Sequence, residues 1–190
     1  MRRLCYFVAS TVDGFIARKN GSFDFFPMTG EHLPYIAAEF PETFSGHHRA
    51  ALGMNACNAH FDTVLMGRNT YEVGVALGIT SPYPHLRQYV VSRSMPWSPD
   101  PAIDLVARDP VECVRELKRE EGLDIWLCGG ARLAGALYDE IDRLIVKVNP
   151  VVLGDGIPLF EGVPGPTTLA LTDHKTFAGG VAIHWYDVVR

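Results

Sequence analysis

The 190-residue sequence has few cysteines, and they do not form a pattern that binds metal. None of them stands in the C-x-x-C spacing of zinc and redox sites, and the seven histidines include no H-E-x-x-H. We therefore expect free thiols, a reducing cytoplasm and no metal site. The four cysteines are Cys5, Cys57, Cys113 and Cys128.

The sequence also lacks a long apolar run and an excess of positive charge. The apolar run at residues 4–9 follows Arg2-Arg3, but it is shorter than the core of a secretion signal and far shorter than the roughly 18 residues of a membrane span. With 17 Lys and Arg against 22 Asp and Glu, the net charge of −5 gives no general attraction to nucleic acid or to an anionic membrane. We expect a cytoplasmic protein that binds neither.

What the sequence does contain is an alternation of strand-length apolar runs with amphipathic segments, typical of an α/β fold. Its length suits a single domain over residues 1–190. The last two strands are joined through Gly179-Gly180, and so short a connection requires an antiparallel hairpin. We expect three layers around a mixed, mostly parallel sheet that carries this hairpin. The expected strands are residues 4–10, 63–66, 88–92, 103–107, 124–128, 144–148, 168–177 and 181–189.

Helix signals fall between these strands. Residues 31–60 contain few strand formers and favour two helices, broken near Pro41 and Ser45-Gly46. Asp109-Pro110 predicts a helix start, with Glu112 completing a capping box, and Gly122 a helix end.

Three expected strands end in residues that suit an anion. Glycine after a strand lets backbone N–H groups approach a phosphate, and a nearby arginine can close over it. Taken singly, such a junction is more often a turn with a surface cation. The G-x-G-x-x-G and G-x-x-x-x-G-K motifs are both absent. The three corners are Gly67-Arg68-Asn69-Thr70, Ser92-Arg93 and Gly129-Gly130-Ala131-Arg132.

Several motifs, in order along nearly the whole chain, resemble the dihydrofolate reductase-like superfamily. Within it, the opening S-x-x-D-G type segment and residues 150–160 are similar to the branch that contains the C-terminal reductase domain of riboflavin-biosynthesis deaminase-reductases. The motifs are STVDGFIA (residues 10–17), DTVLMGRNTYE (62–72), IWLCGGARL (125–133) and PVVLGDGIPLF (150–160).

This resemblance implies an NADPH-dependent reductase of a nitrogen heterocycle or its ribosyl derivative, of the 5-amino-6-(5-phosphoribosylamino)uracil reductase type, working as a homodimer. The zinc motif of the deaminase half is absent, so the chain would be the reductase half alone. By position, Gly67, Arg68 and Thr70 would hold cofactor phosphates, Ser92 and Arg93 the 2′-phosphate region, Gly129, Gly130, Ala131 and Arg132 the pyrophosphate, and Ala9, Ile16 and Ala17 the nicotinamide.

The proton donor is the open question, with three candidate carboxylates. Asp13 would lie near the nicotinamide edge, although an ordinary Asp-Gly turn explains it equally well. Asp24 sits in an aromatic-rich loop, and Glu31 stands roughly where folate reductases carry a carboxylate, but its surroundings depart from the folate pattern. Two alternatives stay open: a nucleotide-binding sensor or partner-binding module without turnover, and a dihydrofolate reductase proper.

Overall fold

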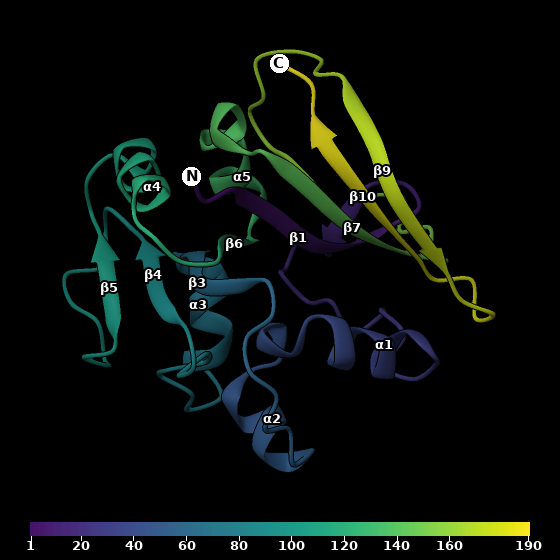
Figure 1. Ribbon diagram of the computed structural model, residues 1–190, viewed down its shortest axis with the longest axis horizontal. Coiled ribbons are helices and arrows are strands. Elements are labelled where there is room, and N and C mark those ends of the chain that lie inside the picture. Colours follow the sequence, from purple (N-terminus) through teal and green to yellow (C-terminus); the bar gives the residue numbers. More distant parts are fainter.

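An eight-stranded sheet runs through the protein in the order β5-β4-β3-β6-β1-β7-β10-β9 (Figure 1). The computed structural model describes residues 1–190. The strands from β5 to β7 in this order are parallel, whereas β10 is antiparallel to both β7 and β9. The mixed sheet with a C-terminal hairpin is thus confirmed. The strands are β1 (Leu4–Thr11), β3 (Phe61–Gly67), β4 (Arg87–Val91), β5 (Ile103–Val106), β6 (Asp124–Gly129), β7 (Arg143–Asn149), β9 (Leu169–Thr176) and β10 (Ala182–Val188).

Short helices connect the parallel strands. They are α1 (His32–Glu39), α2 (Gly46–Ala51), α3 (Arg68–Val75), α4 (Pro110–Arg119) and α5 (Ala131–Ala136), with 3-10 turns η1 (Pro41–Thr43) and η2 (Tyr138–Glu140). The predicted break near Pro41 and Ser45-Gly46 is confirmed, because η1 begins at Pro41 and α2 follows Ser45. None of these helices is long and apolar enough to cross a membrane.

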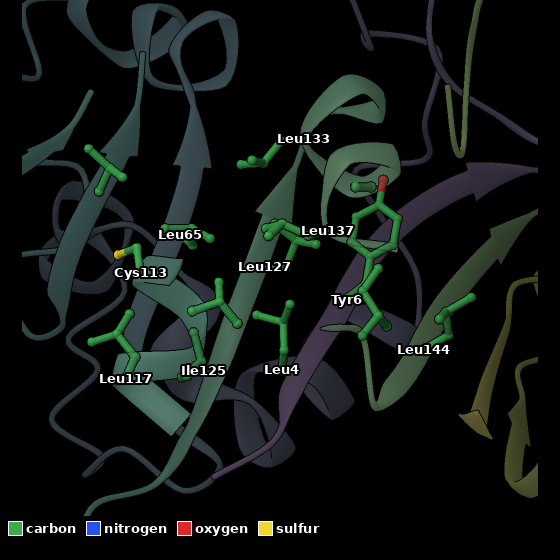
Figure 2. Close-up of a cluster of buried hydrophobic side chains, with 14 of the residues drawn as sticks. Leu4, Tyr6, Leu65, Cys113, Leu117, Ile125, Leu127, Leu133, Leu137 and Leu144 are labelled. Carbon is green, nitrogen blue, oxygen red and sulfur yellow. The ribbon is translucent and has the colours of Figure 1, made fainter. Parts of the chain in front are cut away.

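Hydrophobic clusters cover both faces of the sheet and make the three layers. Successive residues of β1 face opposite sides, as the pleat of a strand requires: Tyr6 lies in one cluster and Phe7 in the other. Helices α4 and α5 cover the first cluster, which Figure 2 shows around Tyr6 and Leu127. Helices α1 and α3 cover the second, through Ile36 and Tyr71. Because both faces are covered, the central strands are rich in apolar residues.

Helix α4 begins as predicted but lacks half of the expected cap. The Asp109 carboxylate accepts a hydrogen bond from the Val111 amide at 2.9 Å, which satisfies one orphan N–H of the first turn. Glu112 instead lies 4.0 Å from Arg108 in an exposed ion pair, so the capping box is not formed. The helix ends at Arg119, before the predicted stop at Gly122.

A separate two-stranded sheet lies beyond the end of β1. It joins β2 (Phe15–Ala17) to β8 (Ile157–Pro158). The pairing needs a glycine at position 156, where a Cβ atom would collide with the Ala17 carbonyl oxygen. The segment after β7 is thereby held against the segment after β1.

Candidate functional site

The carboxyl ends of β3, β4 and β6 bring the three predicted corners to one edge of the sheet. Strand β3 lies between the other two, with Gly67 opposite Val91 of β4 and Met66 opposite Gly129 of β6. A Cβ atom at Gly67 would lie 3.5 Å from the Gly129 carbonyl oxygen and 3.6 Å from the Gly130 nitrogen. Open α/β sheets bind ligands at such an edge.

Backbone N–H groups at this edge suit the binding of an anion. Helix α3 starts directly after Gly67, and no side chain caps its first turn. Its first amides are therefore free to bind an anion. Gly129 has a φ of 125°, which favours glycine whatever the surroundings. Gly67 has an ordinary φ of −75°, and at Gly130 a Cβ atom would meet only the Thr70 hydroxyl, at 3.7 Å. A Cβ atom at either glycine would thus be in ordinary van der Waals contact with its neighbours.

Two of the predicted arginines already have partners within the protein. The Arg68 Nε lies 2.6 Å from Glu72, and its Nη1 donates to the Ser94 hydroxyl at 2.8 Å. The Arg132 side chain is 87% exposed and pairs with Glu161 at 3.0 Å. Either guanidinium would have to turn from its carboxylate to hold a phosphate, so their predicted roles stay predictions.

Arg93 and Ser92, at the end of β4, behave differently from each other. Arg93 is exposed and its guanidinium makes no ion pair or hydrogen bond within the protein. Ser92 is buried, and its hydroxyl oxygen accepts hydrogen bonds from the amides of Ser94 at 3.3 Å and Met95 at 3.0 Å. Ser92 therefore shapes the loop that presents Arg93.

Asp13 holds a loop together at the end of β1. Its carboxylate accepts hydrogen bonds from the Thr11 hydroxyl at 2.6 Å, the Gly154 amide at 2.7 Å and the Leu153 amide at 3.1 Å. These bonds, the one from Thr11 most of all, lower the pKa of Asp13 to about 2. The carboxylate is thus ionised at neutral pH and carries no proton to donate, which favours the turn interpretation.

The other two candidate carboxylates are open to water. Asp24 lies 3.6 Å from Arg18, with a side chain 78% exposed. Glu31 is exposed at the N-cap position of α1, and its side chain makes no capping hydrogen bond. Neither side chain is shielded from water, and the role of either as proton donor stays a prediction.

The residues expected around the nicotinamide lie close to one another. Ala9 is near the end of β1, while Ile16 and Ala17 belong to β2, which lies beside β1. Ala9 stands in register with Lys147 of β7. The assignment of these residues to a nicotinamide stays a prediction, but the three small or apolar side chains do share one end of β1.

Sequence reasoning missed Lys147, the residue beside Ala9. It is a partly buried lysine in the interior of the sheet, and burial lowers its pKa. Burial and the Lys147 charge also lower the pKa of His32 on α1. The signal was present as a single lysine inside the apolar run of residues 144–148.

Comparison with known proteins identifies a family and two relatives of this chain. The sequence matches the RibD C-terminal domain family over residues 2–183. Two uncharacterized proteins of Bacillus subtilis strain 168 are similar over almost their full length. YwjB is 32% identical over 186 residues, covering 97% of each chain, and YyaP is 28% identical over 200 residues, covering 97% of this chain and 95% of YyaP.

Solved structures share the fold at low sequence identity. A Thermotoga maritima diaminohydroxyphosphoribosylaminopyrimidine deaminase/5-amino-6-(5-phosphoribosylamino)uracil reductase superposes with a TM-score of 0.67 at 15% identity, over 99% of this chain and 57% of that one. Enterococcus faecalis dihydrofolate reductase, solved with NADP(H), gives 0.64 at 13% identity, over 99% and 97% of the two chains. The fold is therefore dihydrofolate reductase-like, and the chain belongs to the RibD C-terminal domain family, a riboflavin-pathway reductase-like family.

Proposed function

We propose that the protein is an NADPH-dependent reductase of a nitrogen heterocycle or its ribosyl derivative. The observation that carries the proposal is the meeting of Gly67, Gly130 and Arg93 on one edge of the sheet, with free helix amides and an unpaired guanidinium. The name of the similar Thermotoga enzyme supports a substrate of the 5-amino-6-(5-phosphoribosylamino)uracil type.

The residues present fit a dinucleotide phosphate. The start of α3 offers N–H groups, Gly67 and Gly130 carry no side chain at this edge, and Arg93 supplies an uncompensated positive charge. When bound, NADPH would supply the hydride. The protein would align the nicotinamide with the acceptor near Ala9 and exclude water, which is the larger part of a reductase's task.

A nucleotide titration tests the cofactor. Purified protein is titrated with NADPH and NADH, followed by quenching of tryptophan fluorescence, in the wild type and in Arg93→Ala. We expect NADPH to bind more tightly than NADH, and Arg93→Ala to weaken NADPH by about tenfold or more, because a charge-assisted bond to the 2′-phosphate is lost. Equal weakening of both nucleotides would refute this role of Arg93, and failure of both to bind would refute the reductase.

A turnover assay separates the remaining alternatives. Consumption of NADPH is followed with 5-amino-6-(5-phosphoribosylamino)uracil and, separately, with dihydrofolate. We expect oxidation with the uracil derivative. Oxidation with dihydrofolate together with antifolate inhibition would instead indicate a dihydrofolate reductase proper, and tight nucleotide binding without any turnover would indicate a sensor or partner-binding module.

We also propose that the chain forms a homodimer through β9. All eight residues of this outer strand are exposed, Leu169 and Leu171 among them, and its outer edge has no partner strand. A long open edge is usually protected or paired. Light scattering after gel filtration should show a dimer for the wild type and a monomer for Leu171→Lys. Leu77→Lys, which adds the same charge at an exposed leucine after α3, should stay dimeric.

A further inference from the structure

Lys147 occupies an unusual place for a lysine. It is paired with Ala9 of β1 on one side and with Ile183 of β10 on the other. Lys147 therefore belongs to an interior strand, and its side chain extends from the middle of one face of the sheet. Ile183 and Ile145, which share its face of the sheet, belong to the hydrophobic cluster that α1 covers. The ammonium group therefore projects between the sheet and α1.

The surroundings of Lys147 contain aromatic rings and no carboxylate partner. Its Nζ lies 5.9 Å from the centre of the Phe26 ring, and Phe26 itself is buried. His32 is also buried on this side, where its Nε2 lies 3.3 Å from the Pro27 carbonyl oxygen. Lys147 makes no ion pair and no hydrogen bond within the protein. A cation removed from water in this way lowers stability unless another group supplies the opposite charge.

The other lysines show how the chain treats such groups elsewhere. Lys19 pairs with Asp155 in water, and the buried Lys118 lies 2.7 Å from Asp142. Lys175 is exposed on β9, where it lies over a tyrosine ring. Lys147 alone among the four is partly buried and unpaired. Unpaired buried charges in enzymes tend to mark functional sites.

The position of Lys147 relates it to the acceptor of the proposed reaction. Directly paired strands lie about 4.8 Å apart, so Lys147 stands beside Ala9, where the nicotinamide is expected. The acceptor has to lie against the nicotinamide, and the aromatic side chains toward α1 offer flat apolar contacts to a ring. An anionic oxygen on that acceptor would meet the ammonium group.

We propose that Lys147 binds an anionic oxygen carried by the acceptor heterocycle and thereby selects an acidic ring or a phosphorylated derivative over a neutral one. This inference rests on the proposed function for the place of the acceptor. The binding of the anion itself depends only on Lys147 and its surroundings, so it can be measured without turnover.

Binding of small anions tests the proposal. The probes are barbiturate, which is a ring-borne anion, uracil as its neutral counterpart, and inorganic phosphate, each titrated by calorimetry with and without NADPH. The variants are Lys147→Met, which keeps the length of the side chain, and Lys19→Met as the control, because Lys19 is exposed and pairs with Asp155 away from this face of the sheet. The four lysines are also labelled by reductive methylation with carbon-13, so that each gives its own NMR signal.

We expect barbiturate or phosphate to shift the NMR signal of Lys147. The substitution Lys147→Met should lower the affinity for that anion by about tenfold or more. The affinity for uracil should change by less than about twofold, and Lys19→Met should leave all three affinities unchanged. If only the binding of barbiturate depends on Lys147, the anionic oxygen belongs to the ring of the acceptor. If only the binding of phosphate depends on Lys147, it belongs to a phosphorylated arm. Failure of both anions to bind, or affinities unaltered in Lys147→Met, would overturn the proposal.

Thermal unfolding supplies an independent check. Lys147→Met removes a partly buried, unpaired charge, so its unfolding midpoint should equal or exceed that of the wild type. A clear fall in the midpoint would show that Lys147 serves the fold, and would overturn the proposal. Nucleotide binding is assigned to residues other than Lys147. If the wild type binds no NADPH but binds an anion through Lys147, the proposed reductase function is refuted and the proposal for Lys147 stands.

Discussion

The two edges of the central sheet differ in how fully their charges are matched. At the amino ends of the parallel strands, acids and bases are matched. At the carboxyl ends Arg68 and Arg132 have carboxylate partners, but Arg93 and, inside the sheet nearby, Lys147 are unpaired. The matched pairs stabilise the amino edge, whereas part of the positive charge at the carboxyl edge has no partner within the protein. The pairs at the amino edge are Arg2 with Asp62, Arg3 with Asp124, Lys118 with Asp142, Arg143 with Asp187, and Arg190 with Asp142.

The largest expected effect is at the amino edge, in Glu42→Ala. Glu42 is fully buried, and its carboxylate accepts the amides of Ala59, His60 and Phe61, which lead into β3, at 3.2, 2.8 and 2.9 Å. Removing it leaves these amides without an acceptor, so we expect a loss of about 3 kcal/mol or more in urea unfolding. Glu39→Ala, which removes a half-exposed partner of His60, should cost less than about 0.5 kcal/mol. Similar losses of stability in both variants would contradict the expected difference between the buried Glu42 and the half-exposed Glu39.

A carboxyl-edge substitution should show the converse. Gly67→Ala adds a methyl group that the protein tolerates, because the nearest atoms are at 3.5 Å or more and φ is ordinary. We expect a free energy of unfolding within about 0.5 kcal/mol of the wild type. The NADPH affinity should fall by about tenfold or more, since the methyl group would lie against the Gly130 nitrogen at the proposed phosphate site. Gly165→Ala, with nothing within 4 Å, is the control and should leave both quantities unchanged. Unaltered NADPH affinity in Gly67→Ala would contradict the placement.

A half-exposed pair gives a smaller effect at the amino edge. Arg143 of β7 stands opposite Asp187 of β10, and two hydrogen bonds of 2.6 and 3.1 Å join them. We expect Asp187→Asn to lower stability by about 1 kcal/mol or less, and the loss to shrink in high salt. Arg93→Ala, without a partner to lose, should change stability by less than about 0.5 kcal/mol. An equal, salt-dependent loss in Arg93→Ala would show that Arg93 is paired as well.

The smallest expected effect is the loss, in acid, of the stability that the Asp13 carboxylate contributes. Its pKa in the folded protein, about 2, lies below the ordinary value of 3.8, so its contribution is present above about pH 4 and is lost as the pH falls toward 2. The stability difference between the wild type and Asp13→Asn should therefore shrink over that range in urea unfolding. A difference that stays constant down to about pH 2 would show that the loop contacts do not depend on the charge.

Local patterns predicted much of the fold and part of the site. The apolar runs located each main strand, Gly179-Gly180 identified the hairpin, and Asp109 identified the start of α4. The three corners, two with glycine and one at Ser92-Arg93, lie on one edge as predicted, because parallel strands end on the same side of a sheet. Their roles in binding stay predictions. These features depend on residues close in sequence.

Partners distant in sequence could not be predicted in this way. The Asp13 carboxylate binds amides 140 residues away, and Glu42 binds the amides before β3. Whether an arginine is free or paired depends on which carboxylate the fold brings near it, as Arg132 and Glu161 show. Sequence reasoning could name Asp13 as a turn or a proton donor, but only its partners favour the turn.

The sequence by itself determined the layers, the mixed sheet and the order of the motifs, since strand and helix periodicity and tight turns are local properties of the chain. The tertiary structure decided which charges are neutralised and which stay free, because that depends on contacts across strands. The tertiary structure thereby paired the charged side chains at the amino edge and left Arg93 unpaired at the carboxyl edge. It also placed Lys147 without a partner beside Ala9.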